Sequence, residues 1–184
     1  TNFAVARYTN AGSLDKSGTA VSGFGPDGRL ITDLTDVAGE VADDAAASVI
    51  QADGKILVAG RTGLFGQNSG IVSRYNTDGT LDLSFGPNGR INLGAFNSNG
   101  ITGITLGAPT GNPAIQPIYV TGTVFNQITF RNDIAVASIT ASGEFNTAFG
   151  ANGIALAEFP QNTTAEAIAI QTVNNVELIV AAGH

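Results

Sequence analysis

One segment recurs three times in this 184-residue chain, and the recurrence limits the fold more than any other feature. The clearest copy is residues 74–90 (RYNTDGTLDLSFGPNGR), and weaker copies lie at residues 7–29 and 141–153. Two landmarks, a Phe before Gly and a Gly that ends an apolar run, repeat every 61 to 64 residues. They are Phe24, Phe85 and Phe149, and Gly60, Gly122 and Gly183. The period predicts one repeat segment over residues 1–184, with units at about 1–65, 66–129 and 130–184.

Each unit contains four short apolar runs, which are too short for helices and are bounded by turn residues. In the first unit, two β-compatible runs flank Asp53-Gly54, a strong hairpin signal. The fold class expected is therefore all-β: a β-propeller of four-stranded antiparallel blades, with about three blades in this chain. Residues 60–66 are Gly-rich and are predicted to be a blade-to-blade loop rather than a phosphate-binding loop.

Composition narrows the function classes. The net charge of −7 disfavours binding to nucleic acid, because phosphates would be repelled. No apolar run reaches the 18 or more residues of a membrane span, so membrane insertion is not expected. The absence of Cys removes thiol chemistry and suits an exported protein at the cell surface or outside the cell. The only His is His184, which is either native or part of a purification tag.

Three stretches carry a family resemblance: residues 3–8 (FAVARY), 51–60 (QADGKILVAG) and 78–86 (DGTLDLSFG). Together they resemble the delta-60 repeat, a bacterial β-propeller family long described as a domain of unknown function. The resemblance covers nearly the whole chain and weakens in the third copy, where Ser138-Ile139 replaces Arg-Tyr. It implies a propeller, commonly within large secreted or surface proteins, and it implies no reaction and no catalytic residues.

A closed propeller usually has four to eight blades, so three blades would leave two open apolar faces. The expected partners are other blades of a longer chain or a second copy of this chain, and a protein or glycan surface is also compatible. Because the sequence opens on Thr1, we favour a processed or trimmed part of a longer protein.

Two groups of carboxylates are weak candidates for a metal site, with Ca²⁺ as the compatible ion. Asp78 and Asp82 lie in an oxygen-rich loop, but the other units carry Ala11 and Asp15, or Ser142 and Asn146, at these positions. We therefore favour a structural turn there. The second group is an acidic cluster, interpreted mainly as a solvated loop, with a cation site or a docking surface for a basic partner as the alternatives. Its members are Asp33, Asp36, Glu40, Asp43 and Asp44.

No residue is predicted to be catalytic, since the chain has no Cys and a Ser triad would lack its base. Arg7 and Arg74 are predicted to be structural, paired with turn carboxylates such as Asp15 and Asp82. The two insertions, residues 16–23 and 107–116, are better candidates for recognition. We expect a non-enzymatic scaffold or binding module; the alternative is a hydrolytic, carbohydrate-active propeller with two rim carboxylates about 5–10 Å apart.

Overall fold

The computed structural model describes residues 2–16, 24–34, 43–64, 67–109 and 115–184, and these form twelve strands and one short 3₁₀ turn. The strands of the first half are β1 Phe3–Ala6, β2 Arg29–Thr32, β3 Asp44–Ile50, β4 Ile56–Leu64, β5 Gln67–Tyr75 and β6 Arg90–Leu93. Those of the second half are β7 Ile101–Leu106, β8 Ile118–Asn126, β9 Arg131–Ile139, β10 Ile154–Ala157, β11 Ala165–Val173 and β12 Val176–Gly183. The turn is η1 Pro87–Gly89.

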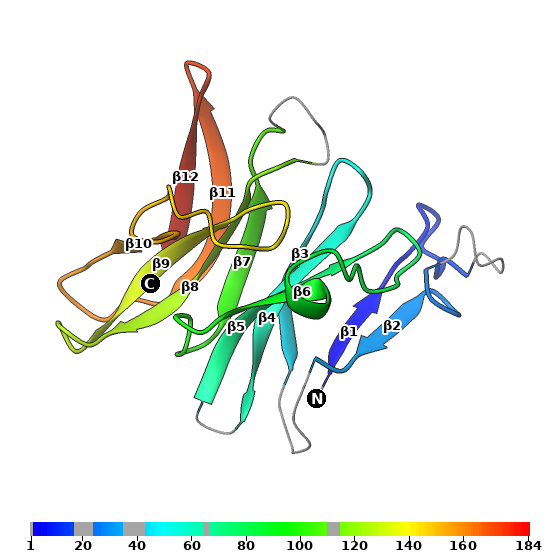
Figure 1. Cartoon of the computed structure of the whole chain (residues 1–184), viewed down its shortest axis with the longest axis horizontal. Helices are drawn as coiled ribbons and strands as arrows, with labels where there is room; N and C mark the ends of the chain where they lie inside the picture. Colours follow the sequence, from blue (N-terminus) through cyan, green and yellow to red (C-terminus); the bar gives the residue numbers. More distant parts are fainter. Residues whose placement is uncertain (1, 17–23, 35–42, 65–66, 110–114) are drawn as a thin grey trace.

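The strands form four sheets in which every paired neighbour is antiparallel. Two sheets are four-stranded, β3-β4-β5-β6 and β7-β8-β9-β10, and two are pairs, β1-β2 and β11-β12. In Figure 1, β1–β2 lies at one end of the molecule with β3–β6 beside it, and β7–β10 and β11–β12 lie together towards the other end. The predicted all-β fold with four-stranded antiparallel blades is confirmed.

The predicted blade boundaries are wrong by half a unit. The sheets span residues 44–93 and 101–157, so they cross the boundaries placed after residues 65 and 129. The cause is residues 60–66: β4 continues through Leu64 and pairs with β5 from Leu64↔Gln67 to Ile56↔Tyr75. Residues 60–64 are therefore strand, and β4 and β5 are antiparallel neighbours within one sheet rather than members of two blades. Each sequence unit therefore supplies the last two strands of one sheet and the first two of the next.

The sequence period itself is preserved in the structure. The same isolated bridge closes the turn after the first strand of every unit: Tyr8↔Leu14, Tyr75↔Leu81 and Ile139↔Phe145. The chain therefore contains two whole blades, β3–β6 and β7–β10, and two pairs of strands that we call half-blades, β1–β2 and β11–β12.

The blades stack face to face through apolar side chains. One cluster lies between the whole blades and includes Val72 and Phe85 of the first and Ala137 and Ile139 of the second, all buried. Another joins half-blade β1–β2 to the first whole blade. Burial of small and β-branched side chains between sheets is the main stabilising contribution that this architecture offers.

The recurring glycine has a packing reason. A Cβ added to Gly60 would lie 1.9 Å from the backbone oxygen of Asp44, and one on Gly122 would lie 2.3 Å from that of Gly100. Gly183 is equally close to the oxygen of Thr164, at 1.8 Å. Each glycine faces a register shift at the start of the neighbouring strand. The period seen in the sequence is therefore imposed by a bulge that only glycine accommodates.

Candidate functional site

The best-defined polar arrangement is the turn after β5, where Arg74 pairs with Asp82. Arg74 Nε donates to Asp82 Oδ2 at 2.7 Å, and Lys55 Nζ donates to the same oxygen at 2.8 Å. The hydroxyl of Ser84 donates to Asp82 Oδ1 at 2.7 Å. The guanidinium also lies over the ring of Phe85, 4.6 Å from its centroid. We call Arg74, Asp82 and Phe85, with their equivalents in other units, the joint.

Asp82 is ionised in this setting. Burial raises its pKa, but hydrogen bonds from Lys55 and Ser84 and the charge of Arg74 outweigh that effect. The pKa of Asp82 therefore lies well below its ordinary value of 3.8. A carboxylate held in this way is neither a proton donor near neutral pH nor an open metal ligand.

The joint recurs in the other units with graded strength. Arg7 pairs with Asp15 at 2.7 Å and lies over Phe24 at 4.8 Å, more exposed than the pair in the second unit. In the third unit the ion pair is replaced by a hydrogen bond from Asn146 to Ser138 at 3.3 Å. The arginine and the carboxylate are both replaced by uncharged residues, so the side-chain contact between the two positions is retained without charge. The predicted structural pairing of the two arginines is confirmed.

The joint also ties each unit to the next. The arginines donate to carbonyl oxygens of the following turn: Arg7 to Thr77 at 2.5 Å and Arg74 to Ala141 at 2.6 Å. Equivalent backbone bonds run beside them, from Gly25 N to Asp78 O at 2.9 Å and from Gly86 N to Ser142 O at 2.7 Å. The segment predicted to connect strands within a blade therefore also connects neighbouring blades.

The remaining metal candidates are engaged in their own turns or strands. Asp78 accepts hydrogen bonds from the backbone and hydroxyl of Thr80, which lower the pKa of Asp78. Asp43 is buried and accepts from Leu34 N at 3.1 Å, and Asp44 forms an ion pair with Arg61 at 2.5 Å across β3 and β4. Within the described ranges, no three Asp, Glu or His side chains are grouped as a metal site would require.

The other members of the acidic cluster contribute less. Asp33 directly follows β2 and has an interaction partner. Asp36 and Glu40 lie outside the described residues. Asp43 thus lies close to the end of β2, and Asp44 is paired with Arg61. A calcium site in the acidic cluster stays a prediction.

The two predicted recognition loops are only partly described, because residues 17–23 and 110–114 fall outside the described ranges. The ends of the second loop are anchored to both neighbouring sheets. Ala52 N donates to the side chain of Gln116 at 2.9 Å, and Ala108 N donates to Glu177 at 2.7 Å. The hairpin tips of β3–β4 and β11–β12 lie along the upper edge of Figure 1, on the same side as the described ends of this loop, residues 107–109 and 115–116.

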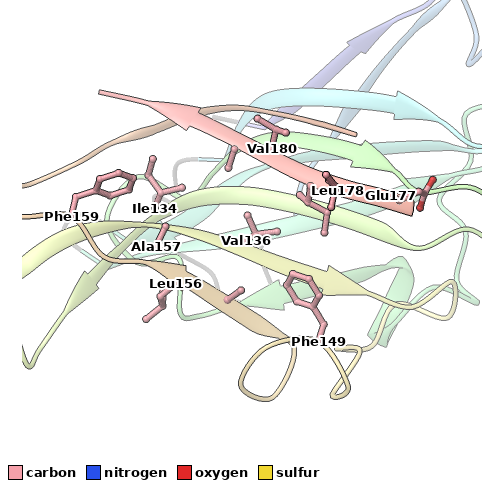
Figure 2. A pocket seen from close by; sticks show the side chains of 12 residues that line it. Ile134, Val136, Phe149, Leu156, Ala157, Phe159, Glu177, Leu178 and Val180 are labelled. Carbon is pink, nitrogen blue, oxygen red and sulfur yellow. The ribbon is translucent and has the colours of Figure 1, made fainter. Parts of the chain in front are cut away.

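Sequence reasoning missed three grooves beside the half-blades. The first, of about 570 Å³, lies between β9, β10 and β12 and is lined by Val136, Phe149, Leu156 and Val180 among others (Figure 2). It holds one carboxylate, Glu177. A second lies on β1–β2, and a third lies between β1 and β3. Correct sheet boundaries would have revealed them, since each groove borders a half-blade.

Residues 51–85 match the family described as "Domain of unknown function (DUF5122) beta-propeller". The matched stretch contains the β3–β4 turn, the β4–β5 hairpin and the joint of the second unit. A search of curated proteins finds no match to the chain. No helix in the described part of the chain is both long and apolar enough to cross a membrane. The resemblance to a β-propeller family of unknown function is thus confirmed for residues 51–85, which are similar to a repeat of that family.

Proposed function

We propose that this chain is a non-catalytic β-propeller module that acts as a scaffold and binds a protein or glycan surface through its rim loops. The observation that carries the proposal is the use of the joint carboxylates. Asp15 and Asp82 are committed to arginine pairs that hold consecutive units together. The residues that recur in the family-like segment therefore serve assembly of the propeller.

Recognition is assigned to the rim that carries residues 107–116. Gln116 and Glu177 fix the ends of this loop to two neighbouring sheets, which supports a loop presented on a rigid frame. Such loops carry binding more often than the strands that support them. The proposal places the module in an exported or cell-surface bacterial protein, in keeping with the absence of Cys and the resemblance to delta-60 repeats.

A loop exchange tests the binding role. Replacing residues 107–116 by the short β3–β4 turn sequence should abolish binding to a glycan array or to purified peptidoglycan sacculi, with an unchanged melting temperature. The matched control replaces the turn residues 172–175 by the same sequence and should retain binding. Binding that survives the exchange would contradict the proposal, as would hydrolysis of chromogenic glycosides that is lost in a Glu177→Gln variant.

The proposal assigns no cofactor, and a calcium titration tests this. Titration calorimetry with CaCl₂ up to about 1 mM should give no binding heat. The melting temperature should not change either, because only a ligand that binds the folded state raises it. A rise in melting temperature that is absent from an Asp43→Asn/Asp44→Asn variant would instead establish a calcium site in the acidic cluster.

A further inference from the structure

The two half-blades correspond to opposite halves of a whole blade. The recurring bridge aligns β1 with β5 and β9, so β1–β2 is equivalent to the last two strands of a blade. The recurring glycine, which lies within β4 and β8 and at the end of β12, makes β11–β12 equivalent to the first two strands. Joined through β12 and β1, the halves would have the strand order of β3-β4-β5-β6.

The edges that would meet are unpaired in the described part of the chain. In whole blades, β4 pairs with β5 and β8 pairs with β9 along their full lengths. Here β12 is hydrogen-bonded to β11 and β1 to β2, and each has no second neighbour among the described strands. Edge strands with free backbone groups and apolar side chains are templates for strand addition.

Burial at equivalent positions shows what these surfaces lack. Tyr8, which follows β1, is 62% exposed, whereas its equivalents Tyr75 and Ile139 are 1% and 0% exposed. Val180 on β12 is 47% exposed, whereas its equivalent Leu57 is fully buried. Inside the molecule these positions are covered by the neighbouring strand pair, so the exposed copies mark surfaces that a further strand pair would cover.

The grooves mark the same surfaces. The groove between β9, β10 and β12 lies where a β5-like strand would extend half-blade β11–β12 and pack on Val136 (Figure 2). Its equivalent inside the molecule is filled, since Ala137 and Ile139 of β9 pack with Val72 and Phe85 of the first whole blade. The groove between β1 and β3 lies where a β7-like strand would cover β3. Half-blade β11–β12 supplies such a strand.

The joint is also left open at both ends. A Cβ added at Gly79 would lie 3.2 Å from the backbone nitrogen of Gly25 in the preceding unit, and one at Gly143 would lie 2.5 Å from that of Gly86. A Cβ added at Gly12 meets nothing within 4 Å. At the other end, Gly150 is exposed, while its equivalents Gly25 and Gly86 are half-buried and donate to the next unit. The donor end and the acceptor end therefore complement each other.

We propose that β1–β2 of a second copy of this chain adds to β12 and completes the blade begun by β11–β12. The pairing of β4 with β5 and of β8 with β9 fixes the register. Ala181 of one copy faces Ala6 of the other, as Val58 faces Ser73 and Val120 faces Ala137. The inference rests on the propeller module proposed above and names one of its partners.

In the proposed dimer each copy supplies both a β11–β12 and a β1–β2 half-blade, so the two composite blades close the ring. Four whole blades and two composite blades make six, within the usual range of closed propellers. Both half-blades lose their edges in the ring, and all three grooves are filled. A head-to-tail contact that closes avoids open filaments.

Cysteine pairing tests the register in a chain that has no native Cys. An Ala6→Cys/Ala181→Cys chain should form a disulfide-linked dimer under mild oxidation, because directly opposed Cβ atoms lie about 4.5–5.5 Å apart. The matched control, Ala6→Cys/Ala182→Cys, places the two thiols on opposite faces and should give at least tenfold less dimer. Equal cross-linking of the two variants, or none in either, would overturn the proposed register.

Sedimentation equilibrium of the unaltered chain provides a second measurement that needs no substitution. The expected mass is twice the 18.6 kDa of one chain. A monomer at all concentrations would overturn the second-copy pairing. The loop exchange described above tests surface binding separately, so a monomer that still binds through residues 107–116 would leave the proposed function standing.

Discussion

Arg74 shows how one side chain serves both a turn and a blade interface. It neutralises Asp82, stacks on Phe85 and donates to the carbonyl of Ala141 in the next unit. Both members of the ion pair are buried, with 7% and 8% of their side chains exposed. Removing one partner of such a pair leaves an uncompensated buried charge, and this determines the cost.

We predict that Asp82→Ala lowers the free energy of unfolding by about 3–5 kcal/mol, because Arg74 is left buried without its carboxylate. The matched variant is Asp15→Ala, whose pair with Arg7 is more exposed. It should cost about 1 kcal/mol, as expected for a partly solvated pair. Urea unfolding measures both, and equal losses would contradict the difference in burial that we assign to the two joints.

Acid should remove the contribution of Asp82. Its folded pKa lies below the ordinary value of 3.8, so its stabilisation is present above about pH 4 and is lost as pH falls through the folded pKa. The stability difference between the wild type and Asp82→Asn should stay constant from about pH 7 to 5 and shrink below about pH 4. A difference that grows with acidification would reverse the sign of the linkage. Unfolding curves at constant ionic strength decide between these outcomes.

At the scale of the elements, the recurring glycine on the second strand of each blade faces the bulge in the first strand and fixes it. Gly60→Ala should destabilise the chain by about 1–3 kcal/mol, the cost of overpacking, because its Cβ meets the oxygen of Asp44. Gly94 is the control, since its added Cβ comes no closer than 4.0 Å to a neighbouring atom. Gly94→Ala should change stability by less than about 0.5 kcal/mol. Thermal unfolding that ranks the two variants in the opposite order would refute the packing role.

The sequence predicted the repeat and the strands better than it predicted the sheets. Turn glycines and apolar runs mark where each strand begins and ends. The same pattern does not show which turns lie within one sheet and which connect two sheets. The links themselves differ: β4 and β5 are joined by a hairpin, while residues 94–100 carry the chain from β6 into the next sheet at β7. Gly63 and Gly66 suggested a loop, yet β4 continues through Leu64.

The joint was predictable in part because its residues lie close in the sequence. The pairing of Arg74 with Asp82 spans eight residues, and its copy in the first unit supported it. The bond to Ala141 spans 67 residues and depends on how blades stack. The grooves beside β1 and β12 depend on the same stacking and on the half-unit offset, so the sequence pattern could not place them.

At the scale of the whole molecule, two whole blades are flanked by two half-blades that complement each other in strand order. The exposed Tyr8 and Val180 then have one explanation, since both belong to surfaces that are buried in the interior copies. The six-bladed ring of two copies that we propose uses the strand order and register of the whole blades. It requires no change in the strands, only the pairing of β12 with β1 of the second copy.

Hydrogen exchange resolved at single amides tests this pairing most directly. In an unpaired antiparallel edge strand, alternate amides face solvent and exchange rapidly. We predict that all amides of β12 at residues 177–182, and those of β1, are protected to the same degree as those of β8, which is paired on both sides. Rapid exchange at every second residue of β12 and β1, with β8 protected, would contradict the composite blade.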